Sequence, residues 1–146
     1  KRYWARVKNL PPEEEMTLTH YLTRNEQQNK SYAHDKSVTG AKRAVLDFKL
    51  IAKSDNYYLL EVDLKTGRHH QIRCQLAKIG CPIKGDLKYG FLRSNSDGGI
   101  SLHARSIEFV HPVSKELIKV VAPVPNDNLW KEFEAMVEKN DEPDNK

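Results

Sequence analysis

Cysteine is scarce in this chain, which has only Cys74 and Cys81 among 146 residues. Two thiols cannot build the disulfide framework of a small secreted domain, so a reducing, cytoplasmic setting is the default expectation. No CxxC pair occurs, although zinc sites are usually recognised by such spacing. His70 and Cys74 are four residues apart and could pair on a helix. Buried structural thiols are the favoured interpretation, and we expect no metal.

Long apolar runs and nucleotide-binding motifs are also absent. No stretch approaches the roughly 20 apolar residues that cross a bilayer, so no membrane contact is expected. No signal-peptide pattern is visible. The sequence contains no Walker loop, no Gly-x-Gly-x-x-Gly and no Gly-x-Ser-x-Gly. A nucleotide cofactor therefore has no support, and we expect no cofactor.

The charge is basic and uneven. The net charge is +4, yet the segment from Glu138 to Lys146 carries four acidic residues against two lysines. The rest of the chain is therefore more basic than the whole. A basic body indicates a polyanionic partner, nucleic acid first. A generic solvated surface explains the charge alone equally well.

Alternating apolar residues predict an antiparallel sheet. Residues 3–7 are β-prone and end at the prolines that follow. Residues 44–50 and 58–64 alternate along a hairpin with one buried face. A second hairpin is predicted from 102–111 and 116–121. Residues 13–23 carry too few apolar positions to be assigned, and residues 24–40 have the polar composition of a loop.

Two helices are predicted beside the sheet. Ile72, Leu76 and Ile79 recur at helical spacing, with Thr66 as a cap and Gly80 at the C′ position. A second helix is predicted over 126–138. Residues 80–99 form a long loop with five glycines, and such loops often bind ligands. The fold class is therefore α+β, with a mixed or antiparallel sheet flanked by helices over residues 1–138. Residues 139–146 are expected to form a disordered acidic tail.

Cations and histidines crowd the start of the first predicted helix, in KTGRHHQIR (65–73). A helix N-terminus is already partly positive, so the cluster is unfavourable unless an anion docks there. Arg73 is a planar fork suited to a carboxylate or phosphate, and His69 is expected on its face. Lys84, Lys88 and Arg93 would extend this basic patch. The alternative is that these side chains simply reach into water.

Four stretches of the sequence resemble the RluA-type RNA pseudouridine synthases. They are KRYWARV (1–7), LLEVDLKTGRHHQIRCQLAKIGCPIKGDLKYG (59–90), LHARSIEFVHP (102–112) and APVP (122–125). The resemblance implies an α+β catalytic domain that converts uridine to pseudouridine in ribosomal or transfer RNA, without cofactor or metal. In that family an aspartate acts on the sugar of a flipped-out uridine, and the uracil rotates and rejoins through a carbon.

The resemblance also implies roles for individual residues. Tyr3 matches the tyrosine that stacks on the target base and helps to remove its carbon-bound proton. Taken alone, Tyr3 would be interpreted as an aromatic core residue on a strand. Arg73 matches the arginine that pairs with the catalytic aspartate. Three further matching positions have RNA-contact or structural roles: Arg68, His70 and Gln71. Ile72 matches part of the apolar wall of the site.

The family's catalytic aspartate has no counterpart in this sequence. It belongs to a His-Arg-Leu-Asp motif upstream of the matching tyrosine, and no such motif occurs here. Asp86, in the long loop, is expected to bond nearby backbone N–H groups instead. We therefore expect an incomplete synthase domain, inactive alone, whose Arg73 awaits a carboxylate from a missing N-terminal part of the same protein.

Two consequences and two alternatives follow. The missing strands should leave an exposed sheet edge, through which the chain could dimerise. The first alternative is a non-catalytic RNA-binding module. A His-Arg-Leu-Asp motif encoded upstream would distinguish the enzyme from this module. The second is a basic interaction domain unrelated to RNA. Salt-dependent RNA binding would count against it.

Overall fold

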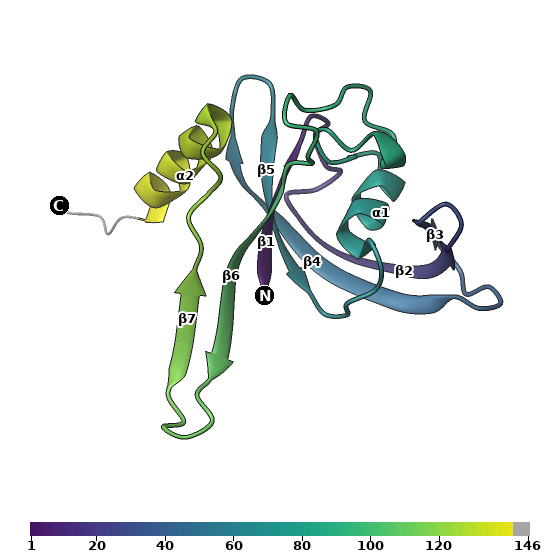
Figure 1. Cartoon of the computed structure of the whole chain (residues 1–146), viewed down its shortest axis with the longest axis horizontal. Coiled ribbons are helices and arrows are strands. Elements are labelled where there is room, and N and C mark those ends of the chain that lie inside the picture. The colour runs from purple at the N-terminus through teal and green to yellow at the C-terminus, as the bar shows by residue number, and fades with distance from the viewer. Residues whose placement is uncertain (142–146) are drawn as a thin grey trace.

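The computed structural model describes residues 1–141, in which seven strands form one antiparallel sheet (Figure 1). The order across the sheet is β3-β2-β4-β5-β1-β6-β7, and each neighbouring pair is antiparallel. The α+β prediction is confirmed. The strands are β1 (Arg2–Val7), β2 (Glu15–Asn25), β3 (Lys30–His34), β4 (Lys42–Lys53), β5 (Tyr58–Leu64), β6 (Leu102–Val110) and β7 (Leu117–Val121).

Both predicted hairpins are present as β4–β5 and β6–β7, and the unassigned region forms a third, β2–β3. In β2 the residues at alternate positions are buried, namely Leu18, His20 and Leu22. The buried histidine interrupts the apolar alternation by which a strand is recognised. In β3 only Ser31 is fully buried. The predicted loop over 24–40 was therefore wrong for the end of β2 and for β3.

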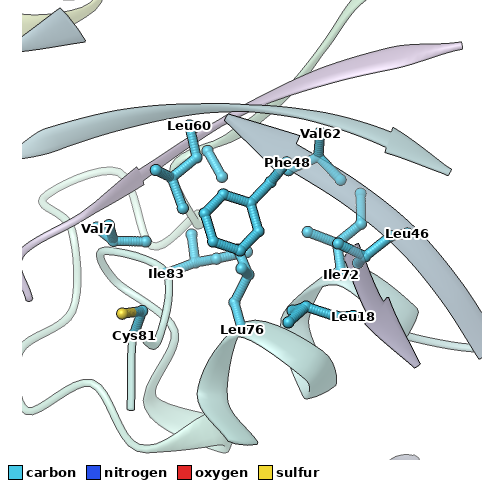
Figure 2. Packing of buried hydrophobic residues seen from close by; sticks show 11 residues of the cluster. Val7, Leu18, Leu46, Phe48, Leu60, Val62, Ile72, Leu76, Cys81 and Ile83 are labelled. Atoms are coloured by element: carbon cyan, nitrogen blue, oxygen red, sulfur yellow. The ribbon is translucent and has the colours of Figure 1, made fainter. Parts of the chain in front are cut away.

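Helices α1 (Gln71–Lys78) and α2 (Asn128–Asp141) cover opposite faces of the sheet. Strand β1 shows the division, because successive side chains of a strand point to opposite faces. Val7 packs in a cluster with Ile72 of α1 (Figure 2). Ala5 belongs to the same cluster, whereas Trp4 packs with Phe133 of α2. The sheet therefore has a separate apolar cluster on each side.

The ends of the helices follow the local sequence only in part. Gly80 follows the C-cap of α1 with φ +86°, and its N–H donates to Ala77 O (3.0 Å) while Cys81 N–H donates to Leu76 O (2.9 Å). This is the glycine-terminated helix end predicted for Gly80. Helix α2 continues to Asp141, so the first three residues of the predicted disordered tail are helical, and the others lie outside the described residues. Neither of the described helices is long and apolar enough to cross a membrane.

The β6–β7 hairpin extends away from both helices, and its outer strand is one edge of the sheet (Figure 1). Large apolar side chains of this hairpin and its turn are exposed: Ile107, Phe109, Val110, Val113, Leu117, Val120 and Val121. Scattered exposed apolar residues are normal, but a group on one hairpin marks a surface suited to packing.

Candidate active site

The turn before α1 is held by a buried glutamine. Gln71 Oε1 accepts hydrogen bonds from the Thr66 hydroxyl (2.8 Å) and Arg68 N–H (2.9 Å), while Gln71 Nε2 donates to Val45 O (3.1 Å). The Thr66 hydroxyl also accepts from Val45 N–H (3.0 Å). The prediction that Thr66 caps the helix was therefore wrong, since His70 occupies the N-cap position. The contacts of Gln71 are those of a structural residue that fixes the turn to β4.

Helix α1 begins later than predicted, at Gln71. His70 has φ 52° and ψ 29°, the left-handed conformation, so Arg68 and His69 precede the helix. A left-handed residue other than glycine is uncommon. The two histidine rings stack, with centroids 3.8 Å apart and planes 24° apart. This stacking is possible because neither histidine lies within the helix, where neighbouring side chains would point in different directions.

Each histidine of the pair contacts a different element. The His69 ring lies between the Ser31 hydroxyl (2.8 Å from Nδ1) and Asn29 Oδ1 (3.0 Å from Nε2), both on the β2–β3 hairpin. The His70 ring lies between the Tyr89 hydroxyl (2.8 Å from Nδ1) and Arg73 (NH1 3.2 Å from Nε2). The pair thus connects α1 to β3 and to the long loop.

His70 is neutral in this site. Burial, and then the charge of Arg73, lowers its pKa to about 4. Arginine can only donate hydrogen bonds, so His70 Nε2 must accept from Arg73 and Nδ1 must carry the proton toward the Tyr89 oxygen. The Tyr89 oxygen also accepts from Ser31 N–H (2.9 Å). Burial likewise lowers the pKa of His69, followed by the charge of Arg24.

Arg73 is paired with a carboxylate inside the chain. Its Nε donates to Asp86 Oδ2 and its NH2 to Asp86 Oδ1, both at 2.8 Å, and the hydrogen bond to Asp86 raises the pKa of Arg73. Asp86 is 1% exposed and the Arg73 side chain 20%. The guanidinium also lies over the Tyr89 ring, 4.9 Å from its centroid. The Arg73 fork therefore already holds one carboxylate from within the chain. The prediction that Asp86 bonds backbone N–H groups was wrong, because both of its oxygens accept from Arg73 instead.

Backbone hydrogen bonds to β1 place the loop that carries Asp86. Lys84 N–H donates to Arg6 O (2.8 Å), Arg6 N–H donates to Ser101 O (3.0 Å), and Ser101 N–H donates to Lys84 O (2.9 Å). Gly85 has φ +85°, and a Cβ there would lie 2.6 Å from the Asn95 side chain. Only glycine fits this conformation and space, so Gly85 directs the next residue toward α1.

Tyr3 and Ile72 lie on the same side of the sheet as α1. Tyr3 pairs with Val62 of β5 and Ala104 of β6, and it packs, partly buried, against the cluster that contains Ile72. Ile72 is 5% exposed. Strand β1 and helix α1 thus bring Tyr3 and Ile72 to one cluster, and Arg73 follows Ile72 directly in the helix.

The three basic loop residues do not form one patch. Lys88 Nζ donates to the Gln28 and Asn29 carbonyls (3.1 and 3.0 Å), and its charge lowers the pKa of both histidines. Lys84 bonds the Asn95 side chain, and burial lowers its pKa. Arg93 lies elsewhere on the surface, where it lines a depression of about 300 Å³ together with Tyr57. Only Lys88 therefore extends the basic cluster as predicted.

The histidines and cysteines of the described residues do not gather with carboxylates into a cluster. No group of three or more His, Cys, Asp or Glu side chains within residues 1–141 could hold a metal ion. Both cysteines are buried, and burial raises the pKa of Cys74 to about 11. A thiol of this kind is inert as a nucleophile at neutral pH.

The family is established by sequence comparison. The family model described as RNA pseudouridylate synthase matches residues 1–78 of this chain. The chain therefore belongs to the RNA pseudouridylate synthase family. Within that family, its motifs and its relatives make it an RluA-type member.

Individual relatives of this chain are also named pseudouridine synthases. An uncharacterized RNA pseudouridine synthase of Bacillus subtilis, YlyB, is 32% identical over 127 residues, which cover 87% of this chain and 41% of YlyB. Ribosomal large subunit pseudouridine synthase D of Xanthomonas campestris is 38% identical over 97 residues, 58% of this chain and 29% of that protein. The chain thus matches well under half the length of these relatives.

A solved structure supports the fold. Human RNA pseudouridylate synthase domain containing 1 superposes with a TM-score of 0.67 at 21% identity, over 99% of this chain and 67% of that one. At this identity the likeness shows the fold alone.

Proposed function

We propose that this chain is part of an enzyme that isomerises uridine to pseudouridine in ribosomal or transfer RNA. The observation that carries the proposal is the family match over residues 1–78, because it includes both Tyr3 and Arg73. Tyr3 stacks on the flipped-out base, and Ile72 belongs to the apolar wall beside it. The reaction needs no cofactor and no metal, and the protein acts in the cytoplasm.

Arg73 still has donors for a second carboxylate. A guanidinium carries five N–H donors. Asp86 accepts from two nitrogens of Arg73 and His70 faces a third, NH1. Because NH1 and NH2 each carry two hydrogens, one donor on each remains, on a side chain that is 20% exposed. In the complete enzyme these donors hold the nucleophilic aspartate, and Asp86 fixes the orientation of the guanidinium.

The chain alone should be inactive. Asp86 cannot replace the missing nucleophile, because it is 1% exposed and both of its oxygens bond Arg73. The test is release of the hydrogen that the new carbon–carbon bond displaces from the uracil ring, in RNA labelled at that position. Residues 1–146 should release no label above background. A longer form of the protein containing a His-Arg-Leu-Asp motif should release it, and turnover by residues 1–146 alone would refute the proposal.

A non-catalytic RNA-binding module is the alternative, and one observation favours it. Since Asp86 already pairs with Arg73, retention of Arg73 does not require a catalytic aspartate. The reading frame upstream of Lys1 separates the two proposals. An encoded His-Arg-Leu-Asp motif supports the enzyme, and its absence or replacement of the aspartate supports the binding module.

The exposed β6–β7 hairpin is the surface on which we place the remaining part of the catalytic domain. Its apolar side chains and open edge would then be covered. Without that part, the chain should self-associate through the same hairpin. Sedimentation of the chain across a concentration series should show dimers, and the double variant Phe109→Ser and Leu117→Ser should reduce them. Unchanged association in that variant would exclude this surface.

A further inference from the structure

Three cations line a depression beside the histidine pair. Arg24 at the end of β2, Lys42 at the start of β4 and Arg68 in the turn before α1 surround a hollow of about 240 Å³. All three are exposed. No acidic residue lines the hollow, and within residues 1–141 none of the three makes an ion pair. Three separate segments of the chain thus bring uncompensated positive charge together.

Arg68 is the fixed member of this group. Its N–H is held by Gln71 Oε1 (2.9 Å), and its Nε donates to Arg43 O (2.9 Å). The two terminal nitrogens of the guanidinium therefore stay available while its position is set by the backbone. A preorganised guanidinium loses less side-chain entropy when it binds an anion than a free one does.

The residues that line the depression are suited to the phosphates of a nucleic acid and not to its bases. No Phe, Tyr or Trp lines it, so there is no aromatic platform on which a base would stack. Arginine and lysine without carboxylates are instead the groups that contact phosphates. His69 also lines the depression, and its pKa is lowered by burial and then by the charge of Arg24, followed by the charges of Arg73 and Lys88 outside the depression.

We infer that this depression binds the phosphate backbone of the RNA, as a sequence-independent docking site separate from the Arg73–Asp86 pair. The inference rests on the proposed function for its RNA ligand. It adds Arg24 and Lys42, from two other segments, to the RNA contact expected of Arg68. The β2–β3 hairpin and the turn before α1 then hold one strand between them.

The test measures RNA affinity as a function of salt. Residues 1–146 are titrated into a fluorescently labelled mixed-sequence RNA strand over a range of KCl concentrations. The test variant carries Arg24→Gln and Lys42→Gln. The matched control carries Lys53→Gln and Lys131→Gln, exposed positions at the end of β4 and on α2. Both lower the net charge by two, from +4 to +2.

The two variants should differ in their salt dependence. Each lost phosphate contact makes the slope of log K against log[salt] shallower by about 0.7 to 1. The test variant should therefore lose about twice that amount, and the control should keep most of the wild-type slope. Equal weakening in both variants would overturn the depression as a site while RNA binding itself stands. Absence of any salt-dependent RNA binding by the wild type would instead remove the proposed function and this inference together.

A second measurement does not depend on affinity. A phosphate in the depression should raise the pKa of His69, because it opposes the charges that lower it. The His69 ring signal, followed by NMR against pH, should shift to a higher pKa when RNA is added to the wild type or the control. An unchanged His69 pKa in RNA-saturated wild type would also overturn the proposal.

Discussion

The Arg73–Asp86 pair makes a sharp prediction for the Asp86→Asn variant. This substitution keeps the shape of the side chain, removes its charge and replaces one acceptor with a donor that faces a guanidinium. Breaking a buried ion pair by removing one partner costs about 3–5 kcal/mol. Because the Arg73 side chain is 20% exposed, water recovers part of that loss. We expect the free energy of unfolding to fall by about 2–4 kcal/mol.

Urea unfolding at fixed pH measures this change as a lower midpoint with an unchanged m-value. Asp55→Asn is the matched control, since Asp55 is exposed in the turn between β4 and β5. It should change stability by less than about 0.5 kcal/mol. The double variant Asp86→Asn and Arg73→Met should recover part of the loss, because no charge is then left unpaired. A cost below about 1 kcal/mol for Asp86→Asn would refute the reasoning, since a neutral hydrogen bond could account for it.

Three further predictions concern the fold and its pH dependence. Phe133→Ala should destabilise the chain by about 3–5 kcal/mol in thermal unfolding, because Phe133 is 0% exposed between α2 and the sheet; a loss below about 1 kcal/mol would mean that α2 is not packed there. Gly85→Ala should cost several-fold more than Gly40→Ala in urea unfolding, since both have positive φ but only Gly85 lacks room for a Cβ; equal costs would contradict this reason. The folded pKa of His70, about 4, lies below the usual value near 6.5, so the unfolded chain binds more protons and stability should fall as the pH drops from 6.5 toward 4. His70→Asn should flatten that fall when midpoints at pH 7 and pH 5 are compared, and an unchanged pH dependence would assign it to other groups.

The sequence predicts the elements whose own pattern matches their burial. Strands β4 and β5 carry the predicted alternation because one face of each packs in the cluster beside α1. The expectation of a single buried face was wrong for β5, where Leu59 is buried on the other face in the cluster of α2. Strand β2 does not, because the buried His20 is stabilised by a hydrogen bond from Gln75 Nε2 (2.8 Å) rather than by apolar contact. A buried polar residue with a distant partner gives no local signal. The third hairpin was therefore missed for a physical reason.

The candidate site was predicted in its residue types and missed in its geometry. The basic character of residues 65–73 is evident, but the left-handed His70 is not, since no side-chain type requires that conformation. The Arg73–Asp86 pair joins residues 13 positions apart. Its formation depends on the backbone bonds that tie Lys84 and Ser101 to Arg6. Contacts of this kind follow from the tertiary fold, and no spacing rule predicts them.

The crowding of cations in residues 65–73, unfavourable at the start of a helix, is reduced in the structure. Two groups of the 65–73 segment carry no net charge into the site near α1: Asp86 neutralises Arg73, and a lowered pKa keeps His70 uncharged. Lys88 binds two backbone carbonyls. Positive charge without a nearby carboxylate is left at Arg24, Lys42 and Arg68, on the rim of one depression. Long-range attraction of a polyanion scales with such uncompensated charge. The depression that we propose for RNA binding is therefore separate from the Arg73 site, where Asp86 balances the charge of the guanidinium.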